Sequence, residues 1–284
     1  MTRRENRDKR PPAVSVVLPT DNRGWIVTRA VDSVLDQNYP QTELIVVDDG
    51  STDDTPRLLA AYGDRLRLIR QANQGVSAAR NAGIRAAGGA LIALLDSDDT
   101  WLPGKLDAQV AYFAANPGAL ICQTEEVWIR NGIRVNPGRR HRKQAGMIFE
   151  RSLALCLVSP SAVMMRRSLL DEVGLFDESL PACEDYDLWL RIAWKYPVHL
   201  IERPLIVKRG GHDDQLSRMP RLDIFRIRSI GSLLDRGCLS PGQREAAVKM
   251  LAAKCAVYAQ GCRKRGRVEE ALHYERLAEH YAMR

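Results

Sequence analysis

Four consecutive residues, Asp96-Ser97-Asp98-Asp99, place three carboxylates directly after the apolar run of residues 90–95. A short buried strand that emerges at the edge of a sheet would end in this segment. Crowded carboxylates repel one another and destabilise a fold unless a cation or a polar ligand lies between them. Mg²⁺ and similar hard cations bind oxygen ligands and commonly bridge carboxylates to a phosphate. The segment therefore predicts a metal–phosphate site, with an Asp-rich turn that caps the next helix as the alternative.

The elements around this segment alternate between strands and helices. Short apolar runs predict strands at residues 14–19, 43–48, 66–69 and 90–95. Apolar residues at helical spacing fill the intervals, and this alternation predicts a parallel sheet with right-handed crossovers. Ligands bind such sheets beyond the carboxyl ends of the strands. The sequence places three polar clusters at those ends: Pro19-Thr20, Asp48-Asp49 and residues 96–99.

Composition sets the class of protein. The chain has 284 residues, of which 45% are apolar and 27% charged, enough for one α/β domain and an addition. No apolar run approaches the ~20 residues that cross a bilayer. The amino terminus lacks the apolar core of a secretory signal, so we expect a disordered tail there. The six cysteines show no C-x-x-C pair or zinc spacing, which indicates reduced thiols in a cytoplasmic protein.

The net charge of +7 is concentrated in three basic runs: the tail, residues 139–143 and residues 263–265. Such runs are ordinarily solvated surface. Contact with anionic lipid, peripherally at the inner face of the membrane, or with a phosphorylated acceptor is the alternative. No nucleic acid partner is expected, because aromatic residues are not interleaved with the basic runs.

Five motifs follow one another in the chain, at residues 16–20, 47–53, 73–83, 95–99 and 184–191. Their order and spacing resemble the family-2 inverting glycosyltransferases, and the resemblance covers residues 14 to about 212. It implies an α/β GT-A fold, with a Rossmann-like, mostly parallel sheet flanked by helices. It also implies a metal-dependent enzyme that moves a sugar from a nucleoside-diphosphate sugar to an acceptor hydroxyl. The donor is expected to be UDP-linked and the acceptor a bacterial surface glycan or glycolipid.

The resemblance also implies roles for individual residues. Asp49 would accept a hydrogen bond from a uracil N–H, and Asp96 would contact the ribose or the metal through water. Asp98 is expected to ligate Mg²⁺ or Mn²⁺ on the diphosphate, and His212 to complete the metal shell, unless it is simply exposed. The expected nucleotide-sugar contacts are Pro19, Thr20, Asp49, Arg80, Asp96 and Ser97. A surface salt bridge is the alternative for Arg80.

The last motif begins with Glu184-Asp185. Leu188, Ile192 and Tyr196 follow at four-residue intervals, which predicts that the acidic pair lies in the first turn of an amphipathic helix. An inverting transfer needs a base to take the acceptor's proton, and one positioned carboxylate can serve. We therefore expect Asp185 to be the base, with Glu184 as its catalytic neighbour. The alternative is that both carboxylates only complement the helix dipole.

The second half of the chain predicts a β-hairpin and a helical end. Residues 127–135 contain an Asn131-Gly132 turn between apolar segments. Near the carboxyl terminus, the spacing of Ala246, Met250, Ala253 and Val257 predicts one helix face, and a further helix follows Gly266. We expect a disordered basic tail at 1–12, a GT-A domain at 13–215 and an all-helical extension at 216–284. The extension can cover the catalytic domain, form a homodimer or bind a partner.

Two tryptophans are candidate surfaces for stacking on a sugar ring. Trp101 and Trp189 both lie close to predicted site residues. Packing in the core is the commoner fate of such side chains.

Two other function classes remain open. Residues 96–100 also match the nucleophile motif of haloacid-dehalogenase-like phosphatases. That family carries the motif on its first strand, whereas three predicted strands precede it here. A non-catalytic nucleotide-sugar-binding protein would require loss of the metal carboxylate or of the base, and both are present.

Overall fold

The computed structural model describes residues 13–212 and 215–284, and the tail predicted to be disordered, residues 1–12, lies outside them. Within the described residues nine strands form one sheet in the order β3-β2-β1-β4-β8-β6-β9-β5, with β7 paired to β6. The strands are β1 (Val14–Thr20), β2 (Thr42–Asp49), β3 (Arg67–Gln71), β4 (Leu91–Leu94), β5 (Thr100–Trp101), β6 (Ile121–Arg130), β7 (Ile133–Val135), β8 (Val163–Arg166) and β9 (His199–Gly210).

The amino-terminal half of this sheet is parallel, as predicted. β1 pairs in parallel with β2 and β4, and β2 pairs in parallel with β3. The four predicted strands are thus confirmed as β1 to β4. The other half is mixed, since β8 runs antiparallel to both β4 and β6 while β9 runs parallel to β6. The carboxyl ends of β1, β2 and β4 consequently meet at one edge, where ligands bind in such folds.

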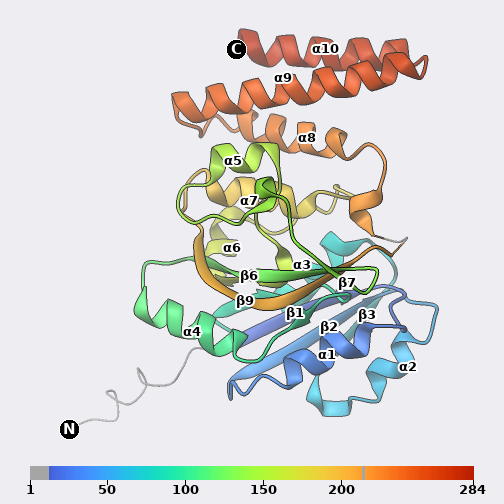
Figure 1. Cartoon of the computed structure of the whole chain (residues 1–284), viewed down its shortest axis with the longest axis vertical. Helices are drawn as coiled ribbons and strands as arrows, with labels where there is room; N and C mark the ends of the chain where they lie inside the picture. Colours follow the sequence, from blue (N-terminus) through green and yellow to red (C-terminus); the bar gives the residue numbers. More distant parts are fainter. Residues whose placement is uncertain (1–12, 213–214) are drawn as a thin grey trace.

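Helices cover both faces of the sheet (Figure 1). The α-helices are α1 (Val27–Leu35), α2 (Thr55–Ala60), α3 (Val76–Ala86), α4 (Lys105–Ala115), α5 (Phe149–Ala154), α6 (Arg167–Val173), α7 (Glu184–Ala193), α8 (Leu222–Asp235), α9 (Pro241–Lys264) and α10 (Val268–Met283). Short 3₁₀ turns are η1 (Gly63–Arg65), η2 (Arg139–His141), η3 (Pro160–Ala162) and η4 (Leu216–Arg218). None of the helices in the described ranges has the length and apolarity that a membrane span requires.

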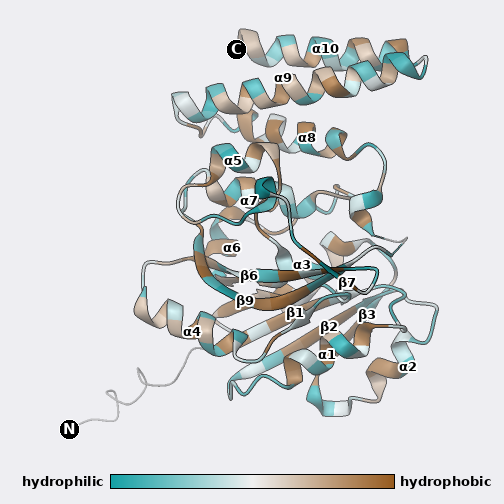
Figure 2. Ribbon diagram, in the orientation of Figure 1, coloured by the Kyte–Doolittle hydropathy of each residue, from teal (hydrophilic) through white to brown (hydrophobic). Residues whose placement is uncertain are grey.

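The central strands separate two hydrophobic cores. Val16 and Val46 belong to a cluster that includes apolar residues of α1, α2 and α4. Their neighbours Val17 and Val47 belong to a second cluster, with residues of α3, α5, α6 and α7. Successive side chains of a strand point to opposite faces, so a sheet covered on both faces needs continuously apolar strands. Figure 2 shows this hydrophobic character along the central strands.

The three carboxyl-terminal helices stack at the end of the molecule away from α1 and α2 (Figure 1). Ile227 and Ile230 of α8 belong to the same hydrophobic cluster as Trp189 of α7, so the core continues into these helices. α9 begins with a complete capping box, in which Ser240 and Gln243 each bond the other's backbone N–H.

The predicted face of α9 is wrong by one residue. Its buried residues include Ala247, Leu251 and Cys255, whereas the predicted Val257 is 64% exposed. α9 packs against both α8 and α10. Contact on two sides buries residues outside any single helical stripe, so a one-sided pattern could not locate them.

A lysine is buried where α4 begins. The Lys105 ammonium donates to Gln109 Oε1 at 2.6 Å and lies 4.0 Å from the centroid of the Trp101 ring. Burial lowers the pKa of Lys105 to about 7. An unfolded lysine has a pKa of about 10.4, so between these values the unfolded chain binds the extra proton. Stability therefore rises with pH across this window and is lost as pH falls towards 7.

We expect this rise of stability with pH to appear when the wild type is compared with the Lys105→Met variant, which lacks the titrating group. The free energy of unfolding of the wild type, minus that of the variant, should increase from pH 7.5 to 9.5 by up to about 1.4 kcal/mol per pH unit. Urea unfolding at several pH values measures it. Lys264→Met, at the exposed end of α9, is the control and should give a flat difference. A flat difference for Lys105→Met would show that the buried lysine stays charged throughout.

Candidate functional site

A cavity of about 810 Å³ lies at the carboxyl ends of β1, β2 and β4. Nine of the ten residues predicted for the site line it, and the tenth, His212, instead contacts one of those nine. The nine are Pro19, Thr20, Asp49, Arg80, Asp96, Ser97, Asp98, Glu184 and Asp185. The structure thus brings together segments that lie more than 160 positions apart in the sequence.

Hydrogen bonds between loops shape one end of the cavity. The side chain of Asn22, after β1, accepts from the backbone N–H of Thr52 at 2.9 Å. Asp21 accepts from the Asn73 side-chain amide at 3.0 Å. Gly50 has a φ of 85°, and a Cβ there would lie 2.7 Å from the backbone nitrogen of Asn73. Only glycine therefore allows the loops after β2 and β3 to approach so closely.

Asp49 holds the loop that precedes α3. Its Oδ1 accepts from the Gln71 side chain at 2.7 Å and from the Gln74 N–H at 3.0 Å, and its Oδ2 accepts from the Gly75 N–H at 2.8 Å. The carboxylate is therefore oriented before any ligand arrives. A contact of Asp49 with a nucleobase stays a prediction.

Thr20 carries a buried hydroxyl with an unmet bonding requirement. The residue ends β1, lines the cavity and is 4% exposed. Among the described residues Thr20 Oγ1 finds no hydrogen-bond partner. A buried hydroxyl without a partner is costly, so a polar ligand in the cavity would relieve this cost.

Arg80 of α3 joins the two acidic motifs. Its guanidinium donates to Asp96 Oδ1 at 2.7 Å and to Glu184 Oε1 at 2.5 Å. It also lies over the Phe176 ring, 5.1 Å from the centroid. The side chain of Arg80 is only 4% exposed, which excludes the surface salt bridge considered for it. One buried cation therefore positions the segment after β4 relative to the first turn of α7.

The direction of the pKa shifts of Arg80 and Glu184 follows from their burial and from this bridge. Burial opposes charge on Arg80, but the carboxylates of Asp96 and Glu184 outweigh it and raise the pKa of the guanidinium. Burial raises the pKa of Glu184, with Asp185 adding to the effect and Arg80 opposing it. A charge-assisted bridge of this kind is stronger than a neutral hydrogen bond.

The remainder of the 73–83 motif serves packing. Asn81 of α3 bonds both the N–H and the carbonyl of Phe176, at 3.0 and 2.9 Å. A Cβ on Gly83 would lie 2.4 Å from Val17 Cγ1, so only glycine lets α3 lie this close to β1. The motif thus fixes α3, and Arg80 with it, against the sheet.

Asp98 and His212 face each other at 2.8 Å, from His212 Nε2 to Asp98 Oδ2. Burial raises the pKa of Asp98, as does Asp96, while His212 opposes the rise. The Trp25 ring packs edge-on against His212, with the centroids 5.6 Å apart. Within the described part of the chain no group of three or more His, Cys, Asp or Glu residues could hold a metal ion. A divalent cation would fit this pair only with further oxygens from a ligand or water.

Asp99, the third carboxylate of the segment, has a structural task. It accepts from the Ser161 hydroxyl at 2.6 Å and from the backbone N–H of Arg209 at 2.8 Å. These bonds tie the segment to η3 and β9. The three neighbouring aspartates consequently have three different surroundings, which residue type and spacing did not reveal.

Asp185 lies half-buried in the first turn of α7, as predicted from the helical spacing. Its Oδ1 accepts from the Tyr186 N–H at 2.7 Å, and its Oδ2 lies 3.4 Å from the Cys156 thiol. Burial, with Asp185 adding to it, raises the pKa of Cys156 well above its usual value. The thiol therefore stays protonated and can donate to the carboxylate. Sequence gave no signal for Cys156, which precedes α7 by 28 positions.

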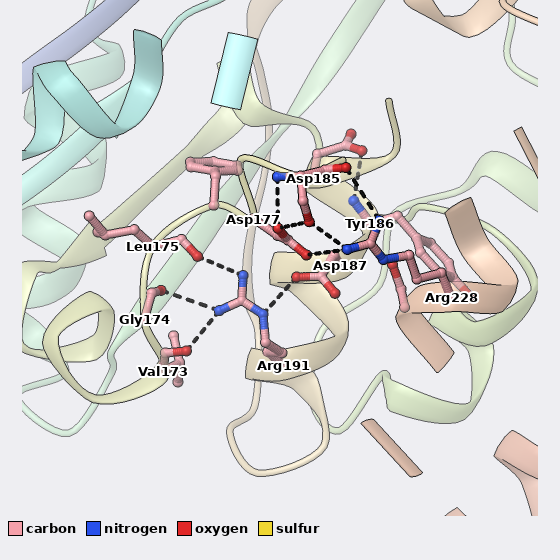
Figure 3. Close-up of polar contacts among 12 residues, drawn as sticks. Val173, Gly174, Leu175, Asp177, Asp185, Tyr186, Asp187, Arg191 and Arg228 are labelled. Atoms are coloured by element: carbon pink, nitrogen blue, oxygen red, sulfur yellow. Dashed lines mark hydrogen bonds and ion pairs between the residues drawn. The ribbon is translucent and has the colours of Figure 1, made fainter. Parts of the chain in front are cut away.

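Arg191 anchors the helix that carries Asp185 (Figure 3). Its Nε donates to Asp187 Oδ2, one turn earlier, at 2.7 Å. Its other nitrogens donate to the carbonyls of Val173 and Leu175, both at 2.7 Å. These bonds join α7 to the end of α6 and the loop after it, so the final arginine of the 184–191 motif orients the helix rather than entering the cavity.

The structure contradicts the sugar-stacking role considered for two tryptophans. Trp101 is 4% exposed and Trp189 is 2% exposed, and both pack in the cores. Trp128 lines the cavity instead, on the predicted hairpin of β6 and β7. Because β6 pairs irregularly with β9 near Glu125, the alternation of residues in the sequence could not predict which face of the sheet Trp128 lies on.

Comparison with known proteins identifies related chains. The model of glycosyl transferase family 2 matches residues 15–174. The Escherichia coli UDP-Glc:alpha-D-GlcNAc-diphosphoundecaprenol beta-1,3-glucosyltransferase WfgD is 32% identical over 181 residues, covering 63% of this chain and 69% of that protein. Escherichia coli chondroitin synthase is 30% identical over 221 residues, covering 76% and 31%. An uncharacterized glycosyltransferase of Rickettsia felis is 29% identical over 218 residues, and this chain spans 35% of its length.

A solved structure shares the architecture. The chain superimposes on S. aureus TarS 1-349 in complex with UDP-GlcNAc with a TM-score of 0.66, covering 93% of this chain and 90% of that one. Sequence identity is 17%, so the likeness concerns the fold.

Proposed function

The chain belongs to glycosyl transferase family 2, and on that premise we propose that it moves a sugar from a nucleoside-diphosphate sugar to an acceptor hydroxyl, with inversion at the anomeric carbon. The observation that carries the proposal is the arrangement of two carboxylates on one cavity. Asp98 lies beside His212, and Asp185 lies in the first turn of α7, with Arg80 bridging the two segments. The first would serve the leaving diphosphate and the second the attacking acceptor.

The proposed donor is a UDP-linked sugar at the ends of β1 and β2. The unpartnered Thr20 hydroxyl and the oriented Asp49 carboxylate support a polar ligand there. WfgD, at 32% identity, is named for a UDP-Glc donor. The remaining contacts are assigned to Pro19, Arg80, Asp96 and Ser97, which line the same cavity.

We propose that Asp98 and His212 hold Mg²⁺ or Mn²⁺. Carboxylate oxygens suit these ions, whereas imidazole is a less usual ligand for them, so most of the coordination would come from Asp98 and from the oxygens of a diphosphate. When bound, the cation would neutralise the negative charge that develops on the leaving diphosphate.

Asp185 is the proposed base. Its carboxylate accepts the proton of the acceptor hydroxyl while that oxygen bonds to the anomeric carbon and the bond from this carbon to the diphosphate breaks. Glu184 is engaged by Arg80 at 2.5 Å, so its proposed part in catalysis is to hold Arg80 and α7 in place. The Tyr186 N–H and the Cys156 thiol would orient the carboxylate of Asp185 for this step.

The acceptor is proposed to be a bacterial surface glycan or glycolipid. Support comes from WfgD and chondroitin synthase, whose names describe glycan-forming enzymes. We further propose that residues 13–215 form the catalytic domain and 216–284 an extension that supports α7. The hydrophobic cluster shared by Trp189, Ile227 and Ile230 is the basis for this role.

The rival classes lack support. The phosphatase motif belongs after the first strand of its sheet, whereas Asp96 follows β4, the fourth strand in the chain. A non-catalytic binding protein does not explain why Asp98 and Asp185 both line the cavity.

Calorimetry of UDP binding to the full chain tests the donor and the metal together. With Mn²⁺ or Mg²⁺ present we expect UDP to bind, and excess chelator should weaken binding by about tenfold or more, because the diphosphate loses its counter-charge. Release of UDP from a panel of UDP-sugars then identifies the sugar. Equal affinity with and without chelator would contradict the metal role, and absence of nucleotide binding would contradict the proposed donor.

A further inference from the structure

The wall formed by Trp128, Arg130, His141 and Lys208 gathers cationic groups around one aromatic ring. Arg130 Cζ lies 5.6 Å and Lys208 Nζ 5.8 Å from the centroid of the Trp128 ring. The His141 ring packs edge-on against it at 5.5 Å. All four residues line the main cavity, although they come from β6, η2 and β9. None of them belongs to the motifs that account for the donor.

The carboxylates near this wall do not balance its positive charge. Glu126 is committed to Lys143, in a buried ion pair of 2.9 Å, and accepts from Trp128 Nε1 at 2.6 Å. The Arg130 side chain has no hydrogen bond or ion pair within the described ranges of the chain, and the residue is exposed at the cavity. Burial opposes charge on Lys208, but Glu126 and the aspartates after β4 outweigh it and raise its pKa, so the ammonium stays charged. Arg130 and Lys208 therefore both face the cavity as cations, and the carboxylates named here pair with Lys143 or lie near Lys208 rather than Arg130.

The behaviour of His141 agrees with this charge balance. Burial lowers its pKa, and Arg140, Arg130 and Lys208 lower it further. Burial first, and then the positive surroundings, thus disfavour a proton on His141.

The wall adjoins the segment that contacts Asp185, the proposed base. Lys208 Nζ lies 3.5 Å from Ser159 Oγ, in the segment after Cys156. Cys156 in turn contacts Asp185 Oδ2. An acceptor whose hydroxyl reaches Asp185 would therefore extend past Cys156 and Ser159 towards Trp128.

A second cavity of about 220 Å³ continues the path. Glu126, Trp128, His141 and Lys143 line both cavities, and Glu125, Arg139 and Arg142 line the second. The basic run of residues 139–143 thus lies along this path rather than on an unrelated surface.

We propose that this wall is an acceptor subsite for a sugar that carries an anionic group, with Arg130 and Lys208 binding the anion and Trp128 contacting the ring. The inference rests on the proposed glycosyl transfer and specifies its acceptor. Arg and Lys recognise phosphate or carboxylate through charge-assisted hydrogen bonds, and the indole provides apolar surface for sugar C–H groups. A phosphate, as in a phosphorylated sugar or lipid-linked glycan, and a carboxylate, as in a uronic acid, share this chemistry.

Ligand-binding NMR tests the proposal without turnover. The full chain is saturated with UDP in a buffer that contains Mg²⁺ and no Mn²⁺. The probes are glucose 1-phosphate, glucuronate and glucose, which share a ring and differ in charge. We expect one or both anionic probes to bind more tightly than glucose, and to lose affinity as salt is raised. Binding of the phosphate probe alone would assign a phosphorylated acceptor, and binding of glucuronate alone a uronate-containing one.

Arg130→Gln should weaken binding of the anionic probe by about tenfold, because it removes a charge-assisted bond at an exposed position. Arg134→Gln is the matched control: it lies on β7 of the same hairpin, is exposed and lies outside the residues that line either cavity. It should change affinity less than twofold.

Two results would overturn the subsite: glucose binding as well as the anions do, or equal effects of Arg130→Gln and Arg134→Gln. Failure of every probe to bind the UDP-saturated protein would overturn it as well. Failure of the proposed function is seen separately, in the saturation step, as absence of UDP binding before any probe is added.

Discussion

Asp185→Asn should lower turnover by about 10²–10⁴-fold while leaving UDP affinity within about twofold of the wild type. The amide matches the carboxylate in shape and can still accept from the Tyr186 N–H, which now lies 2.7 Å from Asp185 Oδ1. It cannot take a proton from the acceptor. The base would contact only the acceptor, so ground-state binding of the donor should not change. Single-turnover rates and calorimetry of UDP binding measure the two quantities.

Asp98→Ala is the matched variant on the opposite side of the cavity. Its carboxylate lies 2.8 Å from His212, and we propose that both hold the cation on the diphosphate. Donor affinity should therefore fall by about tenfold or more, together with turnover.

If Asp185 were only a helix cap, Asp185→Asn would cost about 1 kcal/mol of stability or less and turnover would stay near normal. That result would refute the proposed base.

Arg80→Ala should destabilise the fold by about 3–5 kcal/mol and abolish most activity. The change leaves Glu184, whose side chain is 5% exposed, without its counter-charge, and also releases Asp96. It removes the bond that positions α7 relative to the segment after β4. Urea unfolding measures the stability, and the same preparations supply the turnover number.

The control for Arg80 is Arg85→Ala on the same helix. Arg85 pairs with Glu178 at 3.1 Å, but the two side chains are 62% and 43% exposed. Exposed pairs contribute little, so the loss should be under about 1 kcal/mol. In the double variant Arg80→Ala/Glu184→Ala the unpaired carboxylate is gone, and part of the lost stability should return. Additive losses in that cycle would show that the two residues do not interact.

Several features were predictable from the sequence because they depend on neighbouring residues. β1 to β4 follow from short apolar runs, and α7 follows from apolar residues every four positions after Asp185. The predicted site residues gather at one edge because parallel strands bring their carboxyl ends together. That consequence of topology needs no knowledge of individual side-chain contacts.

Partners in the fold decided what each site residue can do. Glu184 and Asp185 are adjacent and chemically alike, yet Arg80, 104 positions from Glu184, bonds Glu184 and not Asp185. Cys156 reaches Asp185 from a loop with no motif, and Trp128, rather than Trp101 or Trp189, lines the cavity.

The order of the motifs thus indicated the family, and strand and helix periodicity predicted the α/β sheet and the edge at which the candidate site residues gather. The state of each carboxylate, the tryptophan that meets the cavity and the charge of its far wall were decided only by tertiary structure. The physical reason is that periodicity reflects residues a few positions apart in the sequence. Burial and hydrogen-bond pairing are set by residues that come into contact only after the chain has folded. A carboxylate's role depends on those meetings, since the same group is a counter-ion beside Arg80 and an available acceptor beside a thiol.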